Sequence, residues 1–129
     1  MLRFDKFTIK NQEAIQKAME LASELGHQQI ESEHLAYAFL KEEGGIFPAI
    51  IERLGVSVPQ LLTQLEEGLK SKPKVEGAGQ PFLSSTLNNI LRSAQKIAAR
   101  MKDEYAAQEH ILLALLNDES TEISKELRK

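Results

Sequence analysis

The chain has 129 residues, of which 42% are hydrophobic and 27% are charged, with a formal net charge of −3 and no cysteine. These values are typical of one compact soluble domain, and they exclude a disulfide scaffold, a thiol nucleophile and a bulk attraction to nucleic acid or acidic membranes. The first residues show no apolar signal sequence, and no apolar run reaches the roughly 20 residues of a membrane span. We therefore expect a cytoplasmic domain.

The predicted elements of the first half are all helices. Apolar residues three or four positions apart predict a first helix that begins after Thr8, a good N-cap, and ends at Gly26. Ser32 is the expected N-cap of a second helix, which ends before Gly44. Two further helices are expected over about 46–54 and 58–69, each with a proline in its first turn.

Residues 70–81 interrupt the helical pattern because they contain two prolines and two glycines. A segment of this length is long for a loop inside a compact domain, so it predicts a linker between a first repeat, 1–69, and a second repeat, 82–129. A phosphate-binding role for Gly77-Ala78-Gly79 is disfavoured, since no strand is predicted before it and no Lys-Ser/Thr follows it.

The second half repeats the pattern of the first when Glu109-His110-Ile111 is superposed on Glu33-His34-Leu35. This superposition, which we call the repeat alignment, also pairs Thr8 with Ser84 and matches the apolar positions of the following helices without a gap. We therefore expect an all-α fold of two similar helical repeats, about four helices and then about three, related by a pseudo-twofold axis. The repeat alignment pairs Lys129 with Arg53, so the second repeat is expected to be truncated.

The motifs of the first half resemble those of the Clp N-terminal repeat domain. The residues that carry this resemblance are Phe7-Thr8, Gln12-Glu13-Ala14-Ile15, Leu25-Gly26-His27, Ile30-Glu31-Ser32-Glu33-His34-Leu35 and Leu54-Gly55-Val56. Pro73-Lys74-Val75-Glu76-Gly77, followed by Leu83-Ser84, is similar to the ClpB branch of the family. The ClpA and ClpC branches carry Gly-Thr-Glu-His, where this chain has Glu31-Ser32-Glu33-His34 and Ala107-Gln108-Glu109-His110.

The resemblance implies a single Clp N-terminal domain over 1–129, at the head of a homohexameric ATP-driven disaggregase. Its partners would be unfolded or aggregated polypeptides and the rest of the hexamer, with no nucleic acid and no membrane. ATP and magnesium are expected in downstream modules, and no cofactor or enzymatic activity is expected here, because the chain has no Gly-x-x-x-x-Gly-Lys-Ser/Thr motif. The alternatives are the adaptor-docking domain of a ClpA/ClpC-type proteolytic unfoldase and an unrelated helical scaffold or enzyme.

The resemblance also implies an apolar substrate groove on the first two helices of the second repeat. Transferred by position, the groove would involve Leu91, Ser93, Ile97 and His110, of which Ser93 and His110 replace leucines of the family. Leu91 and Ile97 also lie on the apolar stripe of their helix. A role for these two side chains in the hydrophobic core is therefore equally open.

Thr8, Asp103 and Glu109 match family positions linked to aggregate handling. A structural role is also available to Thr8, as an N-cap, and to Glu109, whose carboxylate would lie at the positive end of a helix dipole. Asp103 lies in a predicted turn and has no such role.

Two other patterns have structural interpretations. His34 and His110 recur at the two helix starts, but neither has a second histidine at i+4, so we expect imidazoles bonded to the backbone or packed against the loop, and no metal site. Arg92, Lys96 and Arg100 line one helix face, which is more often solvated than bound to an anionic partner.

Overall fold

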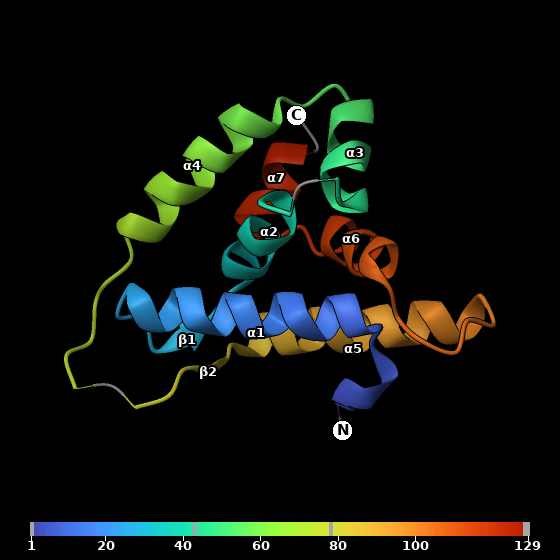
Figure 1. Ribbon diagram of the computed structural model, residues 1–129, viewed down its shortest axis with the longest axis horizontal. Helices are drawn as coiled ribbons and strands as arrows, with labels where there is room; N and C mark the ends of the chain where they lie inside the picture. The colour runs from blue at the N-terminus through green and yellow to red at the C-terminus, as the bar shows by residue number, and fades with distance from the viewer. Residues whose placement is uncertain (1, 43, 78, 128–129) are drawn as a thin grey trace.

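The computed structural model describes residues 2–42, 44–77 and 79–127, without the side chains of residues 122, 123 and 126. Within these residues the chain forms seven α-helices, one 3-10 turn and two very short strands (Figure 1). The helices are α1 (Ile9–Glu24), α2 (Ser32–Leu40), α3 (Ile46–Arg53), α4 (Val58–Lys70), α5 (Ser85–Arg100), α6 (Gln108–Asn117) and α7 (Glu122–Leu127). The 3-10 turn is η1 (Phe4–Lys6), and the strands are β1 (Gln29–Ile30) and β2 (Phe82–Leu83).

The mostly helical fold is confirmed, but the two strands were not expected. β1 and β2 pair in parallel, with Gln29 opposite Phe82 and Ile30 opposite Leu83. A two-residue strand is too short to show the alternation of apolar and polar residues by which strands are recognised in a sequence. Only the tertiary fold, which brings the two segments together, reveals them.

The first residues of the long helices are fixed by hydroxyl caps. The Thr8 hydroxyl accepts the Asn11 N–H at 3.2 Å, and the Ser84 hydroxyl accepts the Leu87 N–H at 3.1 Å. The Thr8 cap is therefore confirmed, and the repeat alignment superposes α1 on α5 from the first residue to the last. The expected Ser32 cap is wrong, because Ser32 is the first residue of α2 and Glu31 is the N-cap.

The helix contacts between the two halves of the chain follow a reciprocal pattern. Each long helix packs on the next helix of its own half, α1 on α2 and α5 on α6, whereas α3 packs on α6 and α7 packs on α2. Figure 1 shows α1 and α5 crossing the lower part of the view, with α2, α3, α6 and α7 above them. In the repeat alignment α3 corresponds to α7 and α2 to α6. The contact of α3 with α6 therefore corresponds to the contact of α7 with α2.

The backbone pairs between the halves show the same exchange. Phe7 pairs with Ala106, and Leu83 pairs with Ile30. The repeat alignment turns Phe7 into Leu83 and Ile30 into Ala106, so each pair becomes the other. A twofold relation between the repeats would give this pattern, so the two pairs support the pseudo-twofold arrangement that we propose.

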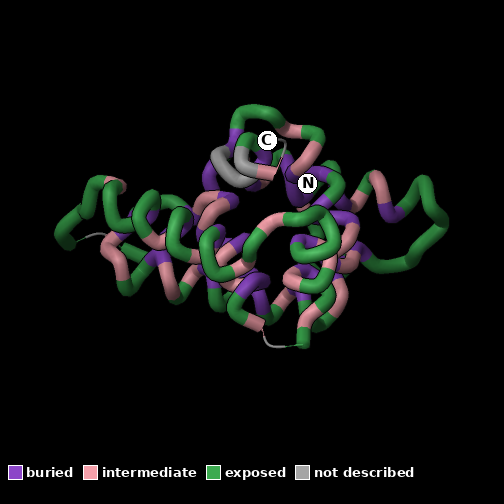
Figure 2. Tube along the Cα trace, turned by 90° about the horizontal axis from the view of Figure 1, so that it is seen from above, coloured by how far each residue is buried: buried purple, intermediate pink, exposed green. Residues whose placement is uncertain are grey.

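Both halves contribute to one hydrophobic core. Buried residues from α1, α2, α3, α4, α5 and α6 form a single cluster, and Figure 2 shows buried segments concentrated at the centre of the molecule. The rings of Phe39 and Phe47 stack there with centroids 5.0 Å apart. No helix in the described part of the chain is long and apolar enough to cross a membrane.

The segment after α4 returns to the turn that follows α1. The Val75 N–H donates to the Gly26 carbonyl at 2.8 Å. The Lys74 side chain packs against Gly26, whose φ of +74° is in the left-handed region favoured by glycine. Lys72 and Lys74 of this segment lie close enough to His27 for their charges to lower its pKa.

Candidate functional site

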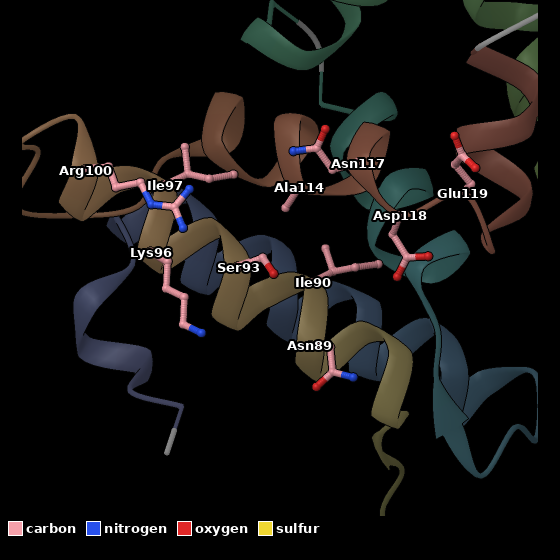
Figure 3. A pocket seen from close by; sticks show the side chains of 10 residues that line it. All are labelled: Asn89, Ile90, Ser93, Lys96, Ile97, Arg100, Ala114, Asn117, Asp118 and Glu119. Carbon is pink, nitrogen blue, oxygen red and sulfur yellow. The ribbon is translucent and has the colours of Figure 1, made fainter.

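A groove runs between α5 and α6 in the second half of the chain (Figure 3). Its volume is about 450 Å³. The lining residues come from α5, from the end of α6 and from the loop after it: Asn89, Ile90, Ser93, Lys96, Ile97, Arg100, Ala114, Asn117, Asp118 and Glu119. We refer to it as the α5–α6 groove.

The α5–α6 groove combines an apolar floor with charged rims. Ile97 is half-buried and presents apolar surface at the base, whereas Ile90 and Ala114 line the base but are almost fully buried. Lys96 and Arg100 belong to the α5 side, and two carboxylates, of Asp118 and Glu119, follow α6. Figure 3 shows Arg100 near one end of the groove and the carboxylates near the other.

The sequence produces this floor because the apolar stripe of α5 is wider than its contact with α6. Ala94 and Ala98 are buried directly in the core, whereas Ile97 lies at the margin of the stripe and remains half-buried. Ala114 on α6 also lines the hollow, and its side chain is a single methyl group. The result is an open hollow in which short extended segments or single side chains could lie against apolar atoms.

The groove contains two of the four residues expected there. Ser93 and Ile97 line it. The groove role expected for Leu91 is corrected, because its side chain is fully buried in the core and does not line the groove. The groove role expected for His110 is also corrected. This residue is only 2% exposed, and its ring nitrogens are hydrogen-bonded to the Ala107 N–H and to the Asp103 carboxylate. Position 91 is therefore a core position and position 97 a groove position, although both lie on one helical stripe.

Thr8, Asp103 and Glu109 do not line the groove. The Thr8 N–H donates to the Ala106 carbonyl at 3.0 Å, which brings Thr8 beside the segment that carries the other two residues. Asp103, for which no structural role was expected, accepts a hydrogen bond from His110. Glu109 is half-buried in the first turn of α6, as expected for a carboxylate near the positive end of a helix. Contact of these three residues with a substrate stays a prediction.

The two repeated histidines have the backbone bonds that we expected. The Glu31 N–H donates to Nδ1 of His34 at 2.8 Å, and the Ala107 N–H donates to Nδ1 of His110 at 2.8 Å. Because Nδ1 accepts in both cases, each neutral imidazole carries its proton on Nε2. Nε2–H of His34 then donates to Nδ1 of His27 at 2.8 Å, whereas Nε2–H of His110 donates to the Asp103 carboxylate at 3.0 Å.

The His27–His34 pair is held in its neutral form. Burial, followed by the charges of His27 and Lys72, lowers the pKa of His34 from 6.5 to about 4. The pKa of His27 is also lowered, mainly by burial and then by Lys72. The sequence analysis did not predict this pair. The repeat alignment pairs His27 with Asp103 and His34 with His110, so the contact of His110 with Asp103 corresponds to that of His34 with His27. Among the described residues no three His, Cys, Asp or Glu side chains are grouped to hold a metal ion.

Comparison with protein families gives one match that spans nearly the whole chain. The family described as the Clp repeat (R) N-terminal domain matches residues 6–129. A curated relative, the chaperone protein ClpB of Nitratidesulfovibrio vulgaris, is 38% identical over 122 residues. That match covers 92% of this chain but only 14% of the relative, so the chain spans about one seventh of the length of the curated relatives it matches.

Solved structures give the same fold. The Hsp104 N-terminal domain from Candida albicans matches with a TM-score of 0.82 at 28% identity, covering 95% of this chain and 79% of that one. A complex of the ClpV N-domain with a VipB peptide matches with a TM-score of 0.78 at 20% identity, covering 88% of this chain and 69% of that one. The helices of this chain are thus arranged as in these two N-terminal domains.

Proposed function

Because the chain belongs to the Clp repeat N-terminal domain family, we propose that it is the substrate-binding N-terminal domain of an ATP-dependent ClpB-type disaggregase. It engages unfolded or aggregated polypeptide and is joined to the remainder of a homohexameric ATPase. The ClpB relatives support this assignment over an adaptor-docking domain of a proteolytic unfoldase. The peptide complex of the ClpV N-domain supports a peptide-binding role for the shared fold.

The observation that carries the proposal is the composition of the α5–α6 groove. Unfolded clients share no sequence, but all of them expose apolar side chains, which can lie against the half-buried Ile97 at the base of the groove. The rims offer two cations, Lys96 and Arg100, and two carboxylates, of Asp118 and Glu119. Since the rims carry both signs of charge, the groove does not select clients of one net charge.

The size of the groove predicts weak binding with little dependence on salt. A small apolar surface must offset the ordering of a flexible polypeptide, so we expect dissociation constants in the micromolar range or weaker. Because the opposed rim charges contribute little net attraction, raising the salt concentration should change the affinity by less than about threefold. Binding governed by Arg92, Lys96 and Arg100 would instead weaken steeply with salt.

The test is a nuclear magnetic resonance titration of the nitrogen-15-labelled chain with a permanently unfolded polypeptide, such as reduced and carboxymethylated α-lactalbumin. We expect shift changes at the amides of Ser93, Ile97 and Asn117. The variant Ile97→Asp should weaken binding by about tenfold, because it places a charge on the apolar floor. The matched control is Ile9→Asp, at a residue that is 69% exposed on α1.

Three outcomes would contradict the proposal. The first is the absence of any shift change at millimolar polypeptide. The second is a set of shift changes centred on Arg92, Lys96 and Arg100 that disappears at high salt. The third is an equal effect of Ile97→Asp and Ile9→Asp on the affinity.

A further inference from the structure

The exposed faces of α1 and α5 carry opposite charges at equivalent positions. The repeat alignment pairs Glu20 with Lys96 and Glu24 with Arg100. All four side chains are exposed, and no ion pair between described residues includes any of them. We refer to Glu20 and Glu24 as the acidic row and to Lys96 and Arg100 as the basic row.

The acidic row has no explanation in the stability of its own helix. The helix dipole favours cations near a C-terminal end and disfavours carboxylates there. The basic row at the end of α5 is therefore favoured, whereas the acidic row includes the last residue of α1. Two carboxylates four positions apart on a helix also repel each other. A cationic surface from a partner would offset both unfavourable effects.

The two rows lie at opposite ends of the molecule. The Thr8 N–H, before α1, donates to the Ala106 carbonyl, after α5. The Ser84 N–H, before α5, donates to the Ile30 carbonyl, after α1. Each long helix therefore begins where the other ends, and Figure 1 shows α1 and α5 running in opposite directions. One molecule cannot pair its own two rows, but two copies placed head to tail can.

Apolar side chains accompany both rows on the same side. Leu21 and Leu25 come one position after the acidic row, and Ile97 and Met101 come one position after the basic row. The two leucines line a hollow of about 250 Å³ between α1, α2 and α4. Met101 is 56% exposed, and Ile97 is half-buried. Each face thus combines two charges with adjacent apolar surface that is open to a partner.

Antiparallel packing of α5 from one copy on α1 of another copy matches both kinds of surface. On any α-helix, a row displaced by one position lies on the same side of the first row when viewed from outside. Two facing helices that run in opposite directions keep these sides together, so charges meet charges and apolar side chains meet apolar side chains. Setting Glu20 opposite Arg100 also brings the other two charges together, and Ile97 then faces the hollow beside α1. Parallel packing would place the charges against the apolar side chains.

The neighbouring charges are compatible with this arrangement. Lys17 lies about one turn before the acidic row, so it faces the turn after α5. That turn has a net negative charge, from Lys102, Asp103 and Glu104. The hollow beside α1 has one carboxylate and one lysine among its lining residues, and these offset each other.

We propose that the chain binds a second copy of itself head to tail, with the basic row of α5 packed antiparallel on the acidic row of the other copy's α1. The contact uses a different surface on each partner, so it can close into a ring or continue as a chain. Because it is small, we expect a dissociation constant on the order of a millimolar. Added salt should weaken it, since the charges are exposed. The inference does not depend on the proposed function, because it involves only copies of this chain.

The experiment measures self-association by sedimentation equilibrium at low salt, in a concentration series that extends to the millimolar range. Lys96→Glu combined with Arg100→Glu should weaken self-association by at least about tenfold, because it sets two acidic faces against each other. Glu20→Lys combined with Glu24→Lys should do the same with two basic faces. An equimolar mixture of these two double variants should associate like the parent chain, since each acidic face then meets a basic one.

The matched control is Glu52→Lys combined with Glu67→Lys, at exposed positions of α3 and α4. It changes the net charge as much as Glu20→Lys with Glu24→Lys does, but it leaves both rows intact. Thermal melting of every variant is measured beside sedimentation. If a charge-reversal variant melts at a lower temperature than the parent chain, Glu20→Gln with Glu24→Gln, which only removes the charges, takes its place and should also weaken self-association.

The proposal is supported if both charge-reversal variants lose self-association, the control keeps it and the mixture restores it. It is overturned if the parent chain stays monomeric throughout the series, if the row variants associate as the parent does, or if the mixture of folded variants stays monomeric.

A nuclear magnetic resonance measurement locates the contact. The nitrogen-15-labelled variant with Lys96→Glu and Arg100→Glu, mixed with the unlabelled variant with Glu20→Lys and Glu24→Lys, should show shift changes at the amides of Leu21, Leu25 and Met101. Shift changes confined to other surfaces would overturn the proposed arrangement. Because no polypeptide is present in these measurements, their failure would leave the proposed function unaffected.

Discussion

The two repeats place a histidine at the same point and give it opposite partners. In the first repeat Nε2–H of His34 donates to a second imidazole, that of His27. In the second repeat Nε2–H of His110 donates to a carboxylate, that of Asp103, which is 49% exposed. The backbone bond to Nδ1 is 2.8 Å in both repeats, so it fixes the orientation of the ring, whereas the partner of Nε2 has changed.

This difference shows that a repeated fold can hold the same side chain in two electrostatic settings. His27 and His34 are buried near the positive charge of Lys72, and both the burial and this charge disfavour a proton on either imidazole. In the second repeat, a carboxylate faces the histidine directly. The His27–His34 pair is therefore the part of the fold that acid should weaken most.

The largest expected effect is a loss of stability in acid that originates in the first repeat. The pKa of His34 is about 4 in the folded chain and 6.5 when unfolded, so the unfolded state binds a proton first as the pH falls. The stabilisation is complete above about pH 6.5 and is lost as the pH falls toward 4. The unfolding free energy should decrease by on the order of 3 kcal/mol from this group. Urea unfolding at a series of pH values measures it.

The control for this prediction is His34→Gln, which keeps hydrogen-bonding atoms near the same place but does not titrate. Its unfolding free energy should be lower at pH 7 and should fall less steeply between pH 6.5 and 4. Parallel pH profiles for the parent chain and His34→Gln would show that His34 is not the group responsible.

A smaller effect is expected when the first repeat is given the partner of the second. His27→Asp places a carboxylate beside Nε2 of His34, and an opposite charge at this distance raises the pKa of a histidine by about 1–2 units. The loss of stability in acid should then shrink by on the order of 1–3 kcal/mol. The shift of the His34 ring protons with pH measures the pKa directly.

His27→Asn is the matched control, since it has nearly the same shape as aspartate but no charge. Because it removes the charge of His27, it should raise the pKa of His34 above about 4, but by less than aspartate does. If aspartate and asparagine at position 27 give the same pKa, the partner's charge does not set the difference between the repeats.

The smallest effect is expected in the second repeat. Asp103 is half-exposed, so solvent screens its interaction with His110, and Asp103→Asn should lower the unfolding free energy by less than about 1 kcal/mol. Thermal melting of Asp103→Asn beside Glu104→Gln, a change at the exposed neighbouring residue, measures the difference. A loss of about 3 kcal/mol or more would match the cost of breaking a buried pair and would contradict this prediction.

Much of the helical framework follows from local features of the sequence. Thr8 caps α1 as expected, and the helix after Ser84 was expected from its apolar spacing. The Ser32 cap was predicted wrongly because a serine before an apolar run is a common signal, whereas the α2 terminus uses a bond from the Glu31 N–H to His34. That bond depends on the orientation of a side chain, which a pattern of residue types does not contain.

The candidate site followed from the sequence only in part. The resemblance indicated a groove on α5 and α6, and the structure has a hollow between these helices that Ser93 and Ile97 line. Asp118 and Glu119 were not anticipated, because they follow α6 and reach the groove only through the path of the loop. A hollow lined by Phe4, Met19, Ile30 and Phe82 was not anticipated either, since these residues are far apart in the sequence and meet only in the tertiary fold.

The sequence by itself determined the helices and the membership of a family, because caps, apolar spacing and motifs are local and survive in a linear pattern. Only the tertiary structure decided that Leu91 is a core residue and Ile97 a groove residue, and that His34 bonds to His27 while His110 bonds to Asp103. Periodicity defines an apolar stripe on a helix. It does not define how much of that stripe the neighbouring helix covers, and that cover separates buried apolar surface from surface available for binding.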